Sequence, residues 1–195
     1  MPSPSIDAAK HALRNSMSRR RRDLSKQERL AGASAIAESD LGFADVTPDA
    51  VISGYAAIRD ELDPEQLLVS LSVNGNSIAL PATLGRGHPL EFRQWDPGSK
   101  LEPGDFSVPV PDENSPVLVP DVLLVPLLAF DLRGYRLGYG AGYYDRTLAE
   151  LRRERGVAAI GLAFDIQQVE NVPHDRYDER LDWVLTPSGA RKIER

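Results

Sequence analysis

The sequence predicts an α/β fold in which helices cover both faces of a largely parallel central sheet. Short apolar runs alternate with helix-like segments along the chain, and the runs 122–130 and 157–164 are almost continuously apolar. Such runs are typical of parallel strands that are buried on both faces. The length of 195 residues fits one domain, and no repeat or linker divides the chain. We therefore expect a single three-layer domain spanning residues 1–195.

The N-terminal half is expected to contain three helices and a strand. Apolar residues spaced on one helical face predict a first helix over 6–22, and the capping-box pattern at 25–28 predicts a second helix to about residue 39. The apolar run 50–57 predicts a strand. A cap residue before a proline predicts a helix over 64–71.

The C-terminal half is expected to continue the alternation after a long loop. Residues 96–120 contain six prolines, which neither a helix nor a central strand tolerates. Loops of this length are usually functional or disordered. Before this loop we also expect strands over 77–80 and 90–95. After it we expect strands over 122–130, 157–164 and 182–186, and a helix over 143–155.

The composition excludes several classes of protein. There is no cysteine, and the three histidines lie far apart, so a zinc hydrolase is not expected. A net charge of -6 argues against a general nucleic-acid binder. No apolar stretch reaches 18 residues and the N-terminus lacks a signal-like apolar core, so we expect a cytoplasmic protein without a membrane span. We expect a monomer, because no exposed apolar stripe indicates an obligate partner.

The segment 136–145 is the strongest candidate for chemistry. Gly138, Gly140 and Gly142 alternate between a buried strand and a helix, so backbone amides can turn toward an anion. The helix N-terminus adds further amides and the positive end of its dipole. Arg136 and Arg146 flank the loop and can neutralise phosphate charge. The pattern favours phosphate binding over a merely structural glycine-rich turn.

Two other phosphate motifs fit less well. The P-loop pattern does not occur in the sequence. A dinucleotide-binding fingerprint needs its first glycine directly after the strand, whereas residues 131–137 intervene here. Asp165, at the end of the next predicted strand, keeps the dinucleotide alternative open because a ribose-binding acid is expected near that position.

Three further groups are candidates with plausible structural alternatives. Lys10 and Arg14 share a face of the first helix and could clamp an anion, although paired cations on a helix are often only solvated, as we expect for the run Arg19–Arg22. Glu61 could accept hydrogen bonds from a heterocycle, or place charge before the next helix. The remaining candidates are possible metal ligands or turn-capping residues: Asp145, Asp175, Asp178 and Asp182.

Taken together, these segments resemble the 5-formyltetrahydrofolate cyclo-ligase (methenyltetrahydrofolate synthetase) family from Lys10 to Thr186. The matching pieces, in family order, are Lys10 and Arg14; Tyr55 with Glu61 and Asp63; Leu80 and Pro81; the proline-rich loop; Val125 and Pro126 with 129–131; 134–146; 161–164 with Gln167; and 172–178 with Asp182. The segment 134–146 is the most specific of them. Ala141, Leu127 and 108–111 depart from the family pattern.

The resemblance implies ATP-dependent cyclisation of 5-formyltetrahydrofolate to 5,10-methenyltetrahydrofolate, with Mg²⁺ as cofactor. It implies a reactive set made of Lys10, Arg14, Arg136 and Arg146. The ATP site would be Lys10, Arg14, Arg136, Leu137, Gly138, Tyr139, Gly140, Ala141, Gly142, Tyr143 and Tyr144. The folate site would be Tyr55, Ala56, Glu61, Tyr139, Gly140, Ala141, Gly142 and Tyr143. Asp145 and Asp178 would hold Mg²⁺.

Two alternatives remain at this point. One is a different enzyme on a similar α/β scaffold, such as a sugar-phosphate isomerase or a coenzyme A transferase. The other is a non-catalytic module that binds a nucleotide without turnover.

Overall fold

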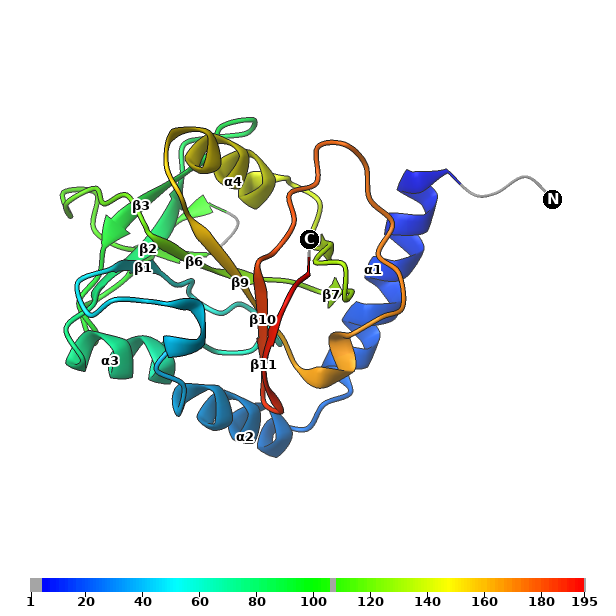
Figure 1. Ribbon diagram of the computed structural model, residues 1–195, viewed down its shortest axis with the longest axis horizontal. Helices are drawn as coiled ribbons and strands as arrows, with labels where there is room; N and C mark the ends of the chain where they lie inside the picture. Colours follow the sequence, from blue (N-terminus) through cyan, green and yellow to red (C-terminus); the bar gives the residue numbers. More distant parts are fainter. Residues whose placement is uncertain (1–4, 106–107, 195) are drawn as a thin grey trace.

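A seven-stranded, largely parallel sheet forms the centre of the molecule in a computed structural model that describes residues 5–105 and 108–194 (Figure 1). Its strand order is β11-β10-β9-β6-β1-β2-β3. The parallel strands are β1 (Val51–Ser53), β2 (Ser77–Thr83), β6 (Val122–Pro126), β9 (Ala158–Leu162) and β10 (Trp183–Thr186). The antiparallel edge strands are β3 (Leu90–Gln94) and β11 (Gly189–Lys192).

Helices cover both faces of this sheet, which confirms the predicted three-layer α/β fold. The helices α2 (Lys26–Ala37) and α3 (Glu65–Val73) lie on one face, and α4 (Tyr143–Glu154) lies on the other (Figure 1). Alternate strand residues serve the two layers: Leu124 packs toward α2 and α3, whereas Leu123 packs on the α4 side. The long helix α1 (Ile6–Arg22) stands at the end of the sheet beside β7 (Ala129–Phe130).

The helix boundaries agree with the sequence because local capping sets them. Ser5 caps α1 by accepting from the Ala8 amide at 3.2 Å. The predicted capping box is present, with Ser25 Oγ accepting from the Glu28 amide and Glu28 accepting from the Ser25 amide. Asp63 Oδ1 accepts from the Glu65 amide at 3.0 Å at the start of α3.

Two strand predictions were too long. The run 50–57 forms a strand only over β1, after which the chain leaves the sheet. The run 122–130 is divided into β6 and β7, and β7 pairs with β8 (Arg136–Leu137) in a separate sheet. The interruption is stabilised by Gln167 Nε2, which donates to the Leu127 and Leu128 carbonyls at 2.7 and 3.2 Å. Gln167 belongs to the 3₁₀ helix η3 (Asp165–Gln167).

Other short elements had no prediction. The edge strand β11 is exposed along its whole length and therefore has no apolar alternation to read. The proline-rich loop contains a two-stranded pair, β4 (Glu102–Pro103) with β5 (Pro109–Val110). A short 3₁₀ helix, η1 (Gly42–Ala44), precedes β1. No helix among the described residues is both long and apolar enough to span a bilayer.

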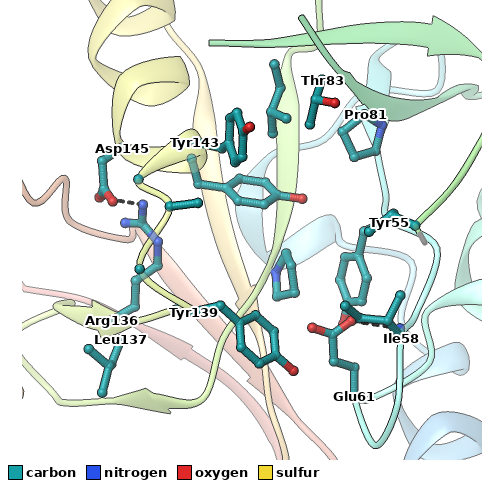
Figure 2. A pocket seen from close by; sticks show the side chains of 18 of the residues that line it. Tyr55, Ile58, Glu61, Pro81, Thr83, Arg136, Leu137, Tyr139, Tyr143 and Asp145 are labelled. Atoms are coloured by element: carbon teal, nitrogen blue, oxygen red, sulfur yellow. Dashed lines mark hydrogen bonds and ion pairs between the residues drawn. The ribbon is translucent and has the colours of Figure 1, made fainter. Parts of the chain in front are cut away.

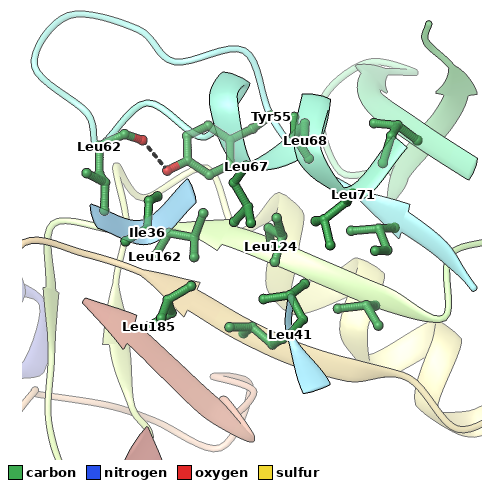
Figure 3. Packing of buried hydrophobic residues seen from close by; sticks show 14 of the residues in the cluster. Ile36, Leu41, Tyr55, Leu62, Leu67, Leu68, Leu71, Leu124, Leu162 and Leu185 are labelled. Atoms are coloured by element: carbon green, nitrogen blue, oxygen red, sulfur yellow. Dashed lines mark hydrogen bonds between the residues drawn. The ribbon is translucent and has the colours of Figure 1, made fainter. Parts of the chain in front are cut away.

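The core beneath α2 and α3 positions the segment that follows β1. Figure 3 shows leucines of α3, including Leu67 and Leu71, packed over Leu124 and Leu162 of the sheet. The Tyr55 ring joins this cluster, and its hydroxyl donates to the Leu62 carbonyl at 2.6 Å. This bond closes the loop 55–62, so the core holds Glu61 at a defined place beside the sheet.

Candidate active site

A cavity of about 520 Å³ opens where the chain leaves the carboxyl ends of β1 and β6. Ligands of open α/β sheets bind at this edge, and the volume suits a small-molecule site. Its walls come from α1, the loop after β1, the proline-rich loop, the glycine loop 138–142 and the segment around Asp178. Segments far apart in sequence therefore meet around one space.

The structure brings the residues implied for the reactive, ATP, folate and metal sites together at this cavity, with one exception. The lining includes Lys10, Arg14, Tyr55, Ala56, Glu61, Arg136, Leu137, Gly138, Tyr139, Gly140, Ala141, Gly142, Tyr143, Tyr144, Asp145 and Asp178. Arg146 is the exception and is not part of the lining. Its Nη2 donates to the Ala141 carbonyl at 2.9 Å, and its guanidinium lies 5.2 Å from the Tyr143 ring centroid. Arg146 therefore supports the glycine loop from outside the cavity.

The glycine loop adopts a conformation that side chains would obstruct. Gly140 has a φ of +102°, and Gly142, with a φ of +69°, is the N-cap residue of α4. Arg14 Nε donates to the Gly138 carbonyl at 2.9 Å, and a Cβ on Gly140 would lie only 3.2 Å from Arg14 Nη2. The first helix thus holds the loop through the cation that the sequence predicted.

Lys10 connects α1 with the segment after η3. Its Nζ lies 2.6 Å from Asp178 Oδ2 and 3.0 Å from Asp175 Oδ2. Burial lowers the pKa of Lys10, but the hydrogen bonds to Asp178 and Asp175 outweigh it, so the net shift is upward. Lys10 is therefore a charged, half-enclosed ammonium group that already has anionic partners at the cavity wall.

Arg136 and Asp145 form a second ion pair on the same side. Arg136 Nη2 lies 2.7 Å from Asp145 Oδ1, and Arg136 Nη1 donates to the Glu179 carbonyl. Burial lowers the pKa of Arg136 while Asp145 opposes that shift. Asp145 Oδ1 also accepts from the Glu179 amide at 3.1 Å, which places it beside the residue that follows Asp178. The two predicted metal ligands therefore face the same part of the cavity.

Glu61 and Tyr139 lie together in another part of the cavity wall, away from the Arg136–Asp145 pair. Figure 2 shows the Tyr139 side chain, from the glycine loop, beside the Glu61 carboxylate, from the loop after β1. Glu61 is 8% exposed, and its Oε2 accepts from the Ile58 amide at 2.9 Å. Burial raises the pKa of Glu61, and hydrogen bonds from Ile58 and Tyr139 partly offset this. Glu61 can thus present a desolvated carboxylate to a hydrogen-bond donor.

Tyrosines supply the aromatic surface of the cavity. Burial raises the pKa of the Tyr55 and Tyr144 hydroxyls, so both remain neutral. Within the described residues, the buried Tyr143 hydroxyl has no hydrogen-bond partner. An unpaired hydroxyl at a cavity wall can bond to a ligand that enters. Two aromatic residues of nearby segments, Phe92 and Trp95, do not line the cavity, and Phe106 lies outside the described residues.

Sequence reasoning missed several wall residues and included others that lie elsewhere. The missed residues are Ile58, Arg59, Pro81, Thr83, Leu90, Asp105, Val108, Val110 and Pro126. The proline-rich composition around Val108 and Val110 was the available signal for that wall. Asp165 accepts from Thr186 Oγ1, and Asp182 accepts from Arg152, so neither faces the cavity. Asp165 is therefore not placed to bind a ribose in this cavity, which removes the main support for the dinucleotide-binding alternative.

Comparison with known proteins identifies the family of this chain. The sequence profile of the 5-formyltetrahydrofolate cyclo-ligase family matches residues 6–187. The 5-formyltetrahydrofolate cyclo-ligase of Escherichia coli (strain K12) is 31% identical over 178 residues, covering 87% of this chain and 95% of the relative. That of Haemophilus influenzae is 33% identical over 139 residues, covering 69% and 74%. The structure of 5,10-methenyltetrahydrofolate synthetase from Aquifex aeolicus superposes with a TM-score of 0.79 at 26% identity, covering 95% of this chain and 93% of that one. The chain therefore belongs to the 5-formyltetrahydrofolate cyclo-ligase family.

Proposed function

We propose that this protein converts 5-formyltetrahydrofolate and ATP to 5,10-methenyltetrahydrofolate, ADP and phosphate in the cavity described above. The observation that carries the proposal is the convergence of two kinds of group on one space. Lys10, Arg14 and the glycine loop form a cationic, amide-rich part, and Glu61 with Tyr55 forms a part suited to a heterocycle. The family membership supports the same reaction.

The chemistry requires activation of an unreactive amide. The formyl group on N5 is a poor electrophile, and its oxygen is a poor leaving group. Transfer of the γ-phosphoryl group to the formyl oxygen forms an O–P bond and releases ADP. N10 then attacks the formyl carbon and loses its proton, and the C–O bond to phosphate breaks. Ring closure is intramolecular, so orientation supplies much of the rate.

The chain's own cations are suited to the first step. Phosphoryl transfer depends on positioning and on neutralising charge rather than on a protein nucleophile. We assign Lys10, Arg14 and Arg136 to the phosphates, because all three line the cavity beside the loop amides. Arg146 receives a different role from the one implied by the resemblance: it holds the Ala141 carbonyl and so maintains the loop.

Mg²⁺ fits the cavity if ATP supplies most of its ligands. Among the described residues, no group of three or more histidine, aspartate or glutamate side chains is arranged to hold a metal ion. Mg²⁺ usually takes one or two protein carboxylates together with phosphate oxygens and water. Asp145 and Asp178, which both line the cavity, meet that requirement. Bound there, the ion would neutralise phosphate charge.

We assign Glu61 to the pterin of the folate. A pterin presents N–H donors along one edge, and a desolvated carboxylate accepts such donors strongly. Tyr55 and Ala56 lie in the same wall, and Tyr143 adds the unpaired hydroxyl. The valines of the proline-rich loop would then contact the folate through apolar surface rather than through hydrogen bonds.

We further propose a cytoplasmic monomer that acts on small molecules without a nucleic-acid partner. The absence of cysteine suits a reducing compartment, and the net charge of -6 disfavours binding to a phosphate backbone.

A turnover assay tests the proposed function directly. Purified protein is mixed with Mg²⁺, ATP and 5-formyltetrahydrofolate, and the methenyl chromophore and ADP are measured together. We expect equimolar formation of both, and none without nucleotide. A protein that bound ATP but formed no product would indicate a nucleotide-binding module. Turnover without ATP consumption would indicate a different enzyme on this scaffold.

A further inference from the structure

One arginine of the basic run at the end of α1 differs from its neighbours. Arg19, Arg20 and Arg22 are exposed, whereas Arg21 is 1% exposed. A buried guanidinium is unfavourable unless its donors are all bound, so the partners of Arg21 are structurally important. The sequence predicted a solvated run, and the structure contradicts that prediction at this residue alone among the four.

The Arg21 guanidinium joins three separate segments around the cavity. Its Nε donates to Asp60 Oδ2 at 3.0 Å, in the loop that carries Glu61. Its Nη1 donates to the Leu127 carbonyl at 3.1 Å, just after β6. Its Nη2 donates to the Tyr139 hydroxyl at 2.6 Å, in the glycine loop. The hydrogen bonds to Asp60 and Tyr139 maintain the charge against the effect of burial, so the pKa of Arg21 is raised.

Helix geometry explains why this residue reaches the cavity region. At 3.6 residues per turn, positions 10, 14 and 21 lie within about 40° of one another around α1. Arg14 contacts the glycine loop, and Lys10 lines the cavity beside Asp178. Arg21, about three turns from Lys10, faces the Glu61 side of the same cavity. One face of α1 therefore serves both parts of the proposed site.

The contact with Arg21 determines how Tyr139 can hydrogen-bond. A guanidinium only donates, so the Tyr139 oxygen accepts from Arg21 and its hydroxyl proton stays available for another acceptor. The Glu61 carboxylate lies beside this hydroxyl, and the interaction with Tyr139 lowers the pKa of Glu61 against the effect of burial. The Tyr139 ring is also held from two directions, with Arg21 at 5.9 Å and Arg59 at 5.5 Å from its centroid.

We propose that Arg21 is a positioning residue for the folate: through Tyr139 and Asp60 it fixes the position and direction of the Glu61 carboxylate. Arg21 touches neither substrate. The proposal rests on the assignment of this cavity to 5-formyltetrahydrofolate. It implies that substitution of Arg21 weakens the binding of folate and not that of ATP, although Arg21 shares α1 with Lys10 and Arg14, two of the three cations assigned to ATP.

The test compares Arg21→Lys and Tyr139→Phe with the matched control Arg22→Lys. Lysine keeps a positive charge near Asp60 but lacks the fork that reaches Tyr139 as well. Binding of 5-formyltetrahydrofolate is measured by calorimetry without ATP, and turnover gives the KM values for both substrates. Circular dichroism and urea unfolding establish that each variant is folded.

We expect both variants to raise the Kd and the KM for folate by roughly tenfold, as for loss of a hydrogen bond to a charged group. The KM for ATP should stay within about twofold of wild type. The double variant should be no weaker than Arg21→Lys alone, because the two residues act through one contact. Arg22→Lys should behave as wild type.

Wild-type folate affinity in a folded Arg21→Lys variant would overturn the proposal, as would additive effects in the double variant. A fall in kcat with both KM values unchanged would also overturn it, because that result indicates a structural role only. If Arg21→Lys fails to fold, Tyr139→Phe decides the question, since it removes one hydroxyl from a partly exposed side chain. The turnover assay on the wild-type protein tests the proposed reaction itself, separately from the Kd and KM values of the variants.

Discussion

Substitution of two neighbouring loop glycines separates ligand binding from stability. A Cβ on Gly138 would have no atom within 4 Å, and the φ of this residue lies outside the left-handed region. A methyl group there would therefore occupy open space at a residue that lines the cavity, without disturbing the protein. A Cβ on Gly140 would meet the Arg14 guanidinium at 3.2 Å, and the φ of +102° disfavours any side chain. The two alanine variants should consequently fail in different ways.

The expected magnitudes follow from these surroundings. Gly140→Ala should lower the free energy of unfolding by about 1–2 kcal/mol, the usual cost of a left-handed backbone for an L-residue. Gly138→Ala should change it by less than about 1 kcal/mol, toward stabilisation, because alanine restricts the unfolded chain. If the loop amides contact phosphate, the methyl of Gly138→Ala should disrupt a charge-assisted hydrogen bond and raise the KM for ATP by roughly 10- to 100-fold.

Urea unfolding and steady-state kinetics with varied ATP measure the two effects. The KM for 5-formyltetrahydrofolate under saturating ATP serves as the internal control in Gly138→Ala. A wild-type KM for ATP in this variant would refute the reasoning, because a methyl group could then occupy the proposed phosphate position without consequence. Equal destabilisation of both variants would show that the open space beside Gly138 does not exist in solution.

Three other outcomes are expected. Arg14→Ala should lower kcat/KM for ATP roughly 100-fold while the protein stays folded, with the exposed Arg20→Ala as the matched control; equal activity of both variants would contradict the phosphate role. Burial raises the pKa of Glu61, and the ionised carboxylate is the form that accepts hydrogen bonds from the pterin. The KM for folate should therefore rise as the pH falls through a value above the ordinary pKa range of glutamate. If a Glu61→Gln variant kept this pH dependence, the titrating group would be a residue other than Glu61. The Asp131 carboxylate is fully buried, pairs with Arg133 and accepts from the Tyr135 and Val172 amides. Asp131→Asn should therefore lower the free energy of unfolding by about 3 kcal/mol. An unchanged urea unfolding curve would refute that magnitude.

Elements with local causes could be predicted from the sequence. The capping box of Ser25 and Glu28, and Asp63 before Pro64, act within three or four residues, so the pattern alone locates the starts of α2 and α3. Features with distant causes could not be predicted. The end of β6 depends on Gln167, about forty positions later in the chain, whose amide holds the Leu127 and Leu128 carbonyls.

The candidate site divides in the same way. The spacing of Lys10 and Arg14 on one helical face, and the alternating glycines 138–142, are visible in the sequence because one short segment carries each pattern. The ion pairs of Lys10 with Asp178 and of Arg21 with Asp60 join residues more than thirty positions apart. Helical spacing places Arg21 on the same face of α1 as Lys10 and Arg14, but only the folded chain shows that this face is buried at Arg21.

By itself, the sequence determined the α/β class, the ends of the helices, the place of the glycine loop between a strand and a helix, and the family resemblance. The tertiary structure alone decided that Arg146 supports the loop from outside the cavity, and that Arg21 lies buried between the two loops at the Glu61 side. The physical reason is the separation along the chain of the residues that interact. Backbone propensity and capping act between near neighbours, whereas burial and the partner of a charge depend on which distant segments the folded sheet brings together.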